Sequence, residues 1–209
     1  MKEMWNERYA DKEYAYGIKP NEFLKETLDT YNLKGKILFP AEGEGRNAVY
    51  AAKKGLEIFA FDISIEGKNK ALKLAEKENV KINYEVGDFF SLNLLNEKFD
   101  IASLIFAHFP PNILSEYHSK IAALIKPNGI IILEGFSKNH FELQKENPNA
   151  GGPKNIDFLF SIDMIKNDFP NFKIILLEEK EIELEEGLFH KAKSNVIRFI
   201  GRKTNIPNL

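Results

Sequence analysis

The sequence predicts an α/β fold in which helices cover both faces of a mostly parallel β-sheet. Short apolar segments alternate with segments of helical periodicity between residues 36 and 134. Two long β-like segments follow near the C-terminus, without a strong helical pattern between them. The length of 209 residues and the 44% hydrophobic content are enough for one domain with a sizeable core. Strands separated by helices form parallel sheets, so we expect a doubly wound arrangement with an antiparallel pair at one edge.

The N-terminal segment, residues 1–33, is predicted to be mainly helical. Pro20 is expected to open its second helix, which contains Phe23 and Leu28. Ser64 is a predicted N-cap of a later helix, and Pro110 is expected to begin another that runs to about residue 125. The strands of the alternating part are expected at 36–41, 57–61, 81–86, 99–106 and 130–134, with a helix at 47–54 between the first two.

The C-terminal part differs from the rest of the chain. Residues 172–184 and 196–202 are predicted to form the antiparallel pair. The acidic run 178–186 is typical of the solvated side of an edge strand. The preceding connection, residues 136–160, is rich in loop-forming residues. Since such long connections are usually functional, we predict that it is a lid or a binding loop.

Composition excludes several kinds of site. The chain contains no cysteine, which excludes disulfides, thiolate metal sites and cysteine nucleophiles. Its histidines lack the spacing of a zinc-binding motif, so no dedicated metal site is predicted. The 29 basic and 31 acidic residues give no global attraction to nucleic acid or to anionic membranes. The N-terminus is polar, and a cytoplasmic protein with no nucleic-acid or membrane partner is expected; no oligomeric state is predicted.

A glycine-containing turn follows the first predicted strand. Gly43-x-Gly45-x-x-Ala48 matches a nucleotide-binding turn. Glycine lets a backbone approach a ligand without a Cβ in the way, and the helix that follows offers unpaired amide groups. A tight turn between a strand and a helix is the alternative interpretation.

Two acidic residues stand at the ends of the next two strands. Asp62 ends the second strand, where a carboxylate can accept hydrogen bonds from ribose hydroxyls. Asp88 follows the third strand and can accept one from an adenine amino group, with Phe89 against the ring. Open α/β sheets bind ligands at the carboxyl ends of their strands, so the turn and both acids predict one nucleotide site.

In order along the chain, these segments resemble the motifs of class I S-adenosylmethionine-dependent methyltransferases. The resemblance is closest to the branch that includes the tellurite-resistance and thiopurine methyltransferase relatives. It rests on "ILFPAEGEGRNAVYAAKKG", "EIFAFDIS", "VGDF", "FDIASLIFAHFPP" and "LIKPNGIIILEGF". The opening "WNERYADKEYAYGIKPNEFL" resembles the N-terminal cover of that branch.

The resemblance implies a Rossmann-like methyltransferase fold with a seven-stranded sheet. It implies a single methyltransferase domain over residues 1–209, with residues 1–33 as a helical cover over the cofactor. The implied cofactor is S-adenosylmethionine, and the implied reaction is an in-line displacement that methylates a small-molecule acceptor. A thiol, a metalloid oxyanion or a small heteroaromatic compound are all open as acceptors.

The sequence departs from the family pattern in the glycine turn. Phe39 stands where an acid is often found, and Ala41 stands in place of the first glycine. Either Glu42 or Glu44 can supply the missing carboxylate. Two glutamates disfavour a dinucleotide pyrophosphate by like-charge repulsion but suit a cofactor that carries a sulfonium and an ammonium group. The methyl donor is therefore preferred to NAD.

The site prediction combines these residues with aromatic and basic neighbours. Arg8 or Arg46 can pair with the cofactor carboxylate, and aromatic faces, Tyr16 among them, attract a sulfonium. The predicted cofactor-binding residues are Trp5, Arg8, Tyr9, Glu42, Gly43, Gly45, Arg46, Asn47, Asp62, Ile63, Asp88, Phe89 and Phe106.

Two histidines are the predicted catalytic residues. A general base is needed only if the acceptor is protonated, and His108 and His190 are the candidates. His108 ends the fourth predicted strand, where the resemblance places the substrate-facing rim, and His190 lies before the last predicted strand and can face the same mouth. His118 and His140 are expected at the surface. Two other functions stay open: a cofactor-binding regulator without catalysis, and an NAD(P)-dependent oxidoreductase with the same turn.

Overall fold

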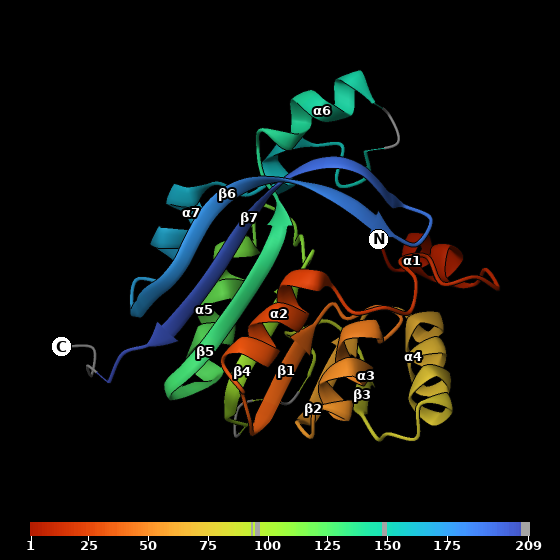
Figure 1. Ribbon diagram of the computed structural model, residues 1–209, viewed down its shortest axis with the longest axis horizontal. Coiled ribbons are helices and arrows are strands. Elements are labelled where there is room, and N and C mark those ends of the chain that lie inside the picture. Colours follow the sequence, from red (N-terminus) through yellow and green to blue (C-terminus); the bar gives the residue numbers. More distant parts are fainter. Residues whose placement is uncertain (93, 95–96, 148–149, 206–209) are drawn as a thin grey trace.

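Seven strands form one mixed sheet in the order β3-β2-β1-β4-β5-β7-β6 (Figure 1). The computed structural model describes residues 1–92, 94, 97–147 and 150–205. The strands are β1 (Lys36–Pro40), β2 (Glu57–Asp62), β3 (Asn83–Val86), β4 (Phe99–Ile105), β5 (Ile125–Phe136), β6 (Phe172–Glu186) and β7 (His190–Lys203). Strands β1 to β5 pair in parallel, whereas β7 is antiparallel to both β5 and β6. The predicted α/β fold with a seven-stranded, mostly parallel sheet is confirmed.

Helices cover both faces of this sheet. The helices are α1 (Lys2–Tyr9), α2 (Glu22–Thr30), α3 (Arg46–Lys53), α4 (Ile65–Lys77), α5 (Leu114–Leu124), α6 (His140–Glu146) and α7 (Ile162–Asp168), with a 3-10 turn at Ile156–Phe158. Helices α2, α3 and α4 pack on one face, and α5 and α7 on the other. Helix α1 lies beside α4 at the edge of the molecule (Figure 1). Of the helices described here, none has the length and apolar character to cross a membrane.

Alternation along the central strands explains why both faces are apolar. In β1, Ile37 and Phe39 face the layer of α2 and α3, while Leu38 faces the layer of α5. Successive side chains of a strand point to opposite faces, so a strand covered on both sides is apolar throughout. Phe39 is fully buried in the first layer. The side chain at this position therefore belongs to the core.

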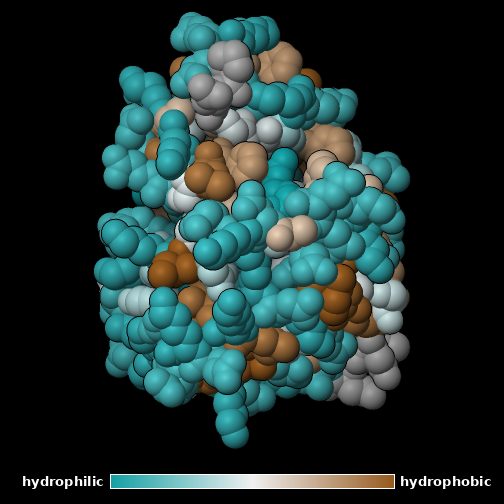
Figure 2. Space-filling model, turned by 90° about the vertical axis from the view of Figure 1, so that its right-hand side faces the viewer, coloured by the Kyte–Doolittle hydropathy of each residue, from teal (hydrophilic) through white to brown (hydrophobic). Residues whose placement is uncertain are grey.

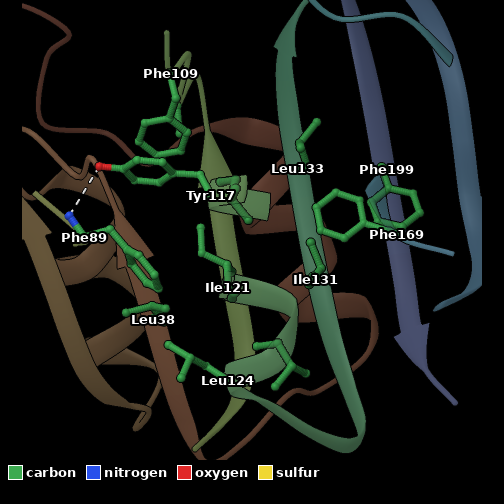
Figure 3. Close-up of a cluster of buried hydrophobic side chains, with 14 of the residues drawn as sticks. Leu38, Phe89, Phe109, Tyr117, Ile121, Leu124, Ile131, Leu133, Phe169 and Phe199 are labelled. Carbon is green, nitrogen blue, oxygen red and sulfur yellow. Dashed lines mark hydrogen bonds between the residues drawn. The ribbon is translucent and has the colours of Figure 1, made fainter. Parts of the chain in front are cut away.

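The layer on the α5 side contains the predicted adenine contact Phe89. Figure 3 shows Tyr117 of α5 between Phe109 and Phe89, and its hydroxyl accepts a hydrogen bond from the backbone N–H of Phe89 at 3.3 Å. The rings of Phe89 and Tyr117 lie 5.5 Å apart, and Phe89 is 7% exposed. Phe89 thus closes the core beneath the end of β3.

The predicted start of one helix is wrong, and the connection after β5 differs from the prediction. Helix α5 begins at Leu114 rather than at Pro110, because residues 110–113 form a turn closed by the Ile113 N–H and the Pro110 carbonyl at 3.0 Å. Proline restricts the residue before it, and two successive prolines delay the helix. The segment 136–160 is less loop-like than predicted, since α6 and the 3-10 turn lie in it. Helix α7 was not predicted, because it is only 7 residues long.

The C-terminal strands are longer than predicted. They form a hairpin in which Glu186 pairs with His190, and Gly187 takes a left-handed φ of 62° in the turn. The prediction began β7 at residue 196 because lysines interrupt the apolar pattern before it. Ala192 and Ser194 nevertheless alternate with those lysines and are buried. Small buried residues gave too weak a signal for this part of the strand.

The prediction that His118 and His140 lie at the surface is wrong, since both side chains are fully buried. The His118 Nδ1 lies 2.6 Å from a carboxylate oxygen of Asp168 and so joins α5 to α7. His140 stacks on Phe136 at 4.3 Å, and its Nε2 lies 3.1 Å from the Ala150 carbonyl oxygen. Partners from distant segments make the burial of these polar rings possible.

A matched pair of glycine variants tests the packing of α3 on α4. Gly45 and Gly55 both have a φ of 85°, but a Cβ on Gly45 would lie 2.5 Å from the Ala71 Cβ, whereas a Cβ on Gly55 would meet nothing within 4 Å. We expect Gly55→Ala to cost about 1–2 kcal/mol of unfolding free energy through backbone strain. Gly45→Ala should cost a further ~1–3 kcal/mol through overlap with α4. Urea unfolding measures both losses, and equal losses would contradict the predicted contact.

Candidate active site

The site begins at the loop that joins β1 to α3. Ala41, Gly43 and Gly45 all have left-handed backbone angles there, with φ of 51°, 62° and 85°. The N–H of Gly43 donates to Oδ2 of Asp62 at 3.0 Å, which fixes the loop against the end of β2. β1 lies between β2 and β4, and the chain winds outward from it in both directions. Open sheets bind ligands at such a switch point.

Asp62 presents a buried carboxylate at this point. Besides Gly43, the N–H of Ser64 donates to it at 2.9 Å, and the side chain is 6% exposed. No side chain of the described residues donates to this carboxylate. Burial raises the pKa of Asp62 to about 6. The carboxylate therefore still lacks donors, such as those that ribose hydroxyls supply.

The structure distinguishes the two glutamates of the loop. Oε1 of Glu42 accepts hydrogen bonds from the N–H groups of Asn47 at 3.0 Å and Ala48 at 2.7 Å, in the first turn of α3. Glu44 points the other way, where it accepts from the N–H of Ala15 at 2.8 Å and pairs with Lys70 at 2.7 Å. Glu44 therefore holds the N-terminal segment in place.

Glu42 is the glutamate that can hold a cationic group. Burial raises the pKa of its carboxyl to about 8, although the two backbone hydrogen bonds and Arg46 oppose this shift. Among the described residues, no hydrogen bond to its Oε2 is found, which leaves one oxygen for a ligand. A cation beside this oxygen would favour the ionised carboxylate.

The aromatic residues of the N-terminal segment gather over the glycine loop. The hydroxyl of Tyr9 lies so close to Gly43 that a Cβ added to this glycine would be 2.7 Å from it. The ring of Trp5 stacks on that of Tyr9, with 5.3 Å between the ring centres. The Arg8 guanidinium lies 4.8 Å from the Trp5 ring and donates to the Tyr16 hydroxyl at 2.9 Å. On the outer side formed by α1 and α4, hydrophilic side chains predominate (Figure 2). The segment thus turns its buried Tyr9 towards the loop.

Arg46 and Asn47 point away from the loop. Arg46 pairs with Glu186 of β6 at 2.8 Å and also donates to the carbonyl of Lys19. The side-chain oxygen of Asn47 accepts from the N–H of Asn21 at 2.9 Å. In this arrangement both residues join the loop to its surroundings, and their contact with a cofactor stays a prediction. The predicted partnership of Arg8 with the cofactor carboxylate is likewise untested.

The residues after β2 and β3 lie at the same edge of the sheet. Ile63 follows Asp62 and is partly exposed. Asp88 is exposed, and its Oδ1 accepts from the N–H groups of Phe90 at 2.8 Å and Ser91 at 3.1 Å. Asp88 is thus held at the rim, whereas the Phe89 ring packs against Phe61 in the core. Their predicted contacts with adenine stay predictions.

Past the end of β4, Phe106 and His108 occupy different surroundings. Phe106 has a left-handed φ of 50°, which is uncommon for a bulky residue, and its ring lies 4.5 Å from that of His190. His108 is held on both sides, with Nδ1 2.7 Å from the Phe158 carbonyl oxygen and Nε2 accepting from the N–H of Phe136 at 3.1 Å. Burial lowers the pKa of His108 to about 4. In this conformation neither ring nitrogen of His108 is free to take a proton from a methyl acceptor.

A buried polar network behind the site was missed by sequence reasoning. The amide nitrogen of Asn21 donates to Glu134 at 2.6 Å and to Glu186 at 3.1 Å, and Arg198 donates to Glu134 at 2.6 Å. The acidic run 178–186 was predicted to be solvated, but the side chain of Glu186 is only 12% exposed, which corrects that prediction at its last residue. The sequence feature that could have indicated this network is Glu134, a charged residue near the end of an apolar strand.

Comparison with known proteins supports this interpretation of the loop. Residues 37–129 match the family model described as a methyltransferase domain. They include β1, β2 and β3, whose ends form the site. The predicted enzyme class and cofactor are therefore confirmed: the protein is a methyltransferase that uses S-adenosylmethionine. No curated protein sequence matches the chain.

Solved structures share the fold at low sequence identity. One, from a study of the conversion of a disulfide bond into a thioacetal group during echinomycin biosynthesis, is 19% identical with a TM-score of 0.78, over 98% of this chain and 92% of that one. TehB from Haemophilus influenzae is 15% identical with a TM-score of 0.71, over 97% and 67%. Magnesium protoporphyrin IX methyltransferase from Synechocystis PCC 6803, with bound SAH, is 17% identical with a TM-score of 0.65, over 87% and 80%.

The donor set fits this cofactor chemically. Asp62 and Glu42 are buried carboxylates that receive only backbone hydrogen bonds from the described residues. S-adenosylmethionine offers ribose hydroxyls, an ammonium group and a sulfonium, all of which suit carboxylates. The pyrophosphate of NAD(P) would place negative charge beside them, so the methyl donor fits and the dinucleotide does not.

The raised pKa values predict how cofactor affinity depends on pH. Asp62 and Glu42 are protonated in the free protein below about pH 6 and pH 8 respectively, and the ionised forms are the better acceptors. Affinity should therefore rise with pH between 5.5 and 8, by up to about tenfold per pH unit below the pKa of one such group. Isothermal titration with S-adenosylmethionine measures this slope. An affinity that is flat, or falls, over this range would contradict the assignment of both carboxylates.

Proposed function

We propose that the protein transfers a methyl group from S-adenosylmethionine to a small-molecule acceptor by in-line displacement. The observation that carries the proposal is the pair of buried carboxylates, Asp62 and Glu42, on either side of Gly43. Both lack side-chain donors among the described residues, and both lie at the carboxyl edge of the parallel strands. The segment that matches the methyltransferase-domain model, residues 37–129, includes the same loop.

In this proposal the chain's residues have separate roles in holding the cofactor. Asp62 accepts from the ribose hydroxyls, and Glu42 accepts from the ammonium group. Ile63, Asp88 and Phe89 border the adenine. The rings of Trp5, Tyr9, Tyr16 and Phe106, with Arg8 and Arg46, complete the site on the side of the sulfonium and the carboxylate. An aromatic face attracts such a cation by about 0.5–2 kcal/mol.

The donor supplies an already activated methyl group, so the protein mainly has to align the acceptor and exclude water. Orientation can contribute about 7–11 kcal/mol in favourable cases. Residues 1–33 serve as a cover over the cofactor in this proposal, and residues 136–160 serve as a lid over the acceptor. In support, a Cβ on Gly151 would lie 3.3 Å from the His190 ring, and one on Gly152 would lie 2.8 Å from Phe136. A closed site of this kind suits a small acceptor rather than a nucleic acid.

We also place the protein in the tellurite-resistance and thiopurine methyltransferase branch. The likeness to TehB extends over 97% of this chain, which takes in most of the N-terminal cover, whereas the likeness to magnesium protoporphyrin IX methyltransferase extends over 87%. The shared cover supports the assignment. It does not identify the acceptor.

Substitution of Asp62 tests the proposed cofactor site. Asp62→Asn keeps the size of the side chain but weakens acceptance from the ribose hydroxyls, and hydrogen bonds to charged groups contribute about 1.5–3 kcal/mol. We therefore expect S-adenosylmethionine to bind about tenfold to a hundredfold more weakly. Asp29→Asn, at an exposed carboxylate paired with Lys54, is the matched control and should bind as the natural protein does.

Isothermal titration and an assay of adenosylhomocysteine release give the two readouts. No binding by the natural protein would refute the function, and so would equal affinities of D62N and D29N. Tight binding without transfer to any thiol, amine, hydroxyl or oxyanion would instead favour a cofactor-binding regulator.

A further inference from the structure

The hairpin of β6 and β7 places an imidazole and a carboxylate side by side at the site. Glu186 ends β6 and His190 begins β7, and the two residues pair across the turn. Nδ1 of His190 lies 3.0 Å from Oε2 of Glu186, and the two side chains are 6% and 12% exposed. Neither residue lies in the segments that resemble methyltransferase motifs.

The carboxylate of Glu186 is fixed from several sides. Arg46, the first residue of α3, donates to its Oε2 at 2.8 Å, and Asn21 donates to its Oε1 at 3.1 Å. Burial alone would raise the pKa of Glu186, but the hydrogen bond from His190 and the Arg46 guanidinium outweigh it and lower the pKa to about 2. Glu186 is therefore an ionised, immobile acceptor.

A fixed carboxylate determines which nitrogen of His190 carries the proton. Nδ1 donates to Glu186, so Nε2 keeps a lone pair. No hydrogen bond to this Nε2 is found among the described residues. His108 differs, since both of its nitrogens are engaged by the backbone. Of the two predicted bases, only His190 is left with an available nitrogen.

The surroundings of His190 are aromatic and positively charged. The rings of Tyr16 and Phe106 both lie 4.5 Å from it, and that of Phe136 lies 5.3 Å away. The charged and titratable groups that face it are Glu186 from β6, Arg46 from α3, Arg8 from α1, Tyr16 from the segment after α1, His140 from α6 and His108 after β4. Burial, together with the two arginines, lowers the pKa of His190 despite Glu186. The ring is consequently neutral and able to accept a proton at neutral pH.

We propose that His190 is the general base of the methyl transfer, that Glu186 positions it, and that the acceptor is a flat apolar molecule with a hydroxyl group that must lose a proton. The inference rests on the proposed function. The aromatic walls suit a flat ring. A cationic acceptor would be repelled, and an acceptor that is already ionised would need no base.

The proton and electron balance of the step is simple. The hydroxyl proton moves to Nε2 of His190, while the acceptor oxygen uses its lone pair to bond to the methyl carbon. The bond between that carbon and the sulfonium sulfur breaks, and its electron pair stays on the sulfur. The imidazolium, held by Glu186, then releases its proton to solvent.

Two aromatic probes of the same shape test the base. 2-Naphthol is protonated at neutral pH, whereas 2-naphthalenethiol is already largely ionised. We expect His190→Gln to slow methylation of 2-naphthol by about 10²–10⁴-fold and to change that of the thiol little. The natural enzyme should methylate 2-naphthol at a rate that is flat between pH 7 and 8.5, whereas the rate of H190Q should rise with the naphtholate fraction.

A second comparison tests the positioning residue. Glu186→Gln should reduce 2-naphthol methylation by an intermediate amount, whereas Glu181→Gln, on the same strand but 52% exposed, should not reduce it. Nitrogen-15 NMR of the histidine rings gives a readout without cofactor or turnover. His190 should carry its proton on Nδ1 in the natural protein, with an increased share of Nε2–H in E186Q.

The outcomes separate this inference from the proposed function. If the natural protein fails to bind S-adenosylmethionine, the proposed function fails and this inference fails with it. If the natural protein binds the cofactor but H190Q methylates 2-naphthol as fast as the natural protein does, His190 is not the base. An Nε2–H ring at His190 in the natural protein overturns the inference even if E186Q does not fold. Transfer only to amines or to ionised oxyanions overturns the acceptor class.

Discussion

Asn21 joins four elements around the candidate site. Its side-chain oxygen caps α2 through the Leu24 N–H at 3.0 Å, and its side-chain nitrogen donates to Glu134 and to Glu186. Its backbone N–H donates to Asn47 in α3. One buried residue therefore fixes α2, α3, strand β5 and the C-terminal hairpin relative to one another. Because a half-satisfied buried network is costly, each of these elements depends on the others being in place.

The buried carboxylates of the site reduce the stability of the free protein. The pKa values of Asp62 and Glu42 are raised by burial to about 6 and about 8, above those of exposed carboxyls. The folded state therefore holds protons that the unfolded state releases. Their contribution to stability is greatest below about pH 4 and is lost as pH rises through the folded pKa values. A cationic ligand rich in hydroxyl groups reverses this cost, so stability and cofactor binding are linked at the same two residues.

The sequence was most informative where the spacing of apolar residues and the place of a residue in its strand pointed to the same structure. The alternation of apolar strands and helices predicted β1 to β5, since Leu38 and Phe39 must face opposite layers. Asp62 became a candidate because the glycine turn, Asp62 and Asp88 follow three consecutive strands, at the edge where open α/β sheets bind ligands. The choice between Glu42 and Glu44 was not readable, because both stand in one loop and only the fold shows which of them meets α3.

Other features depended on contacts between distant segments. His118 and His140 looked like surface residues because their partners, Asp168 and Ala150, lie far along the chain. Glu186 looked solvated because its neighbours in the sequence are acidic and exposed, and only the hairpin brings it to Arg46. Local patterns report which face of an element is apolar. They do not show which buried polar group forms a hydrogen bond with a residue far along the chain.

The two predicted bases show how the same side chain takes different roles. His108 stacks between Phe136 and Phe160 and uses both nitrogens to hold β5 and the 3-10 turn at Ile156–Phe158 together. It aligns the segment that contacts His190, without a free nitrogen of its own. Only Nδ1 of His190 has a hydrogen-bond partner among the described residues, the Glu186 carboxylate, which Arg46 and Asn21 also hold. Among the described residues, the proposed base and the structural histidine therefore differ in the number of their hydrogen-bond partners, which is two for His108 and one for His190.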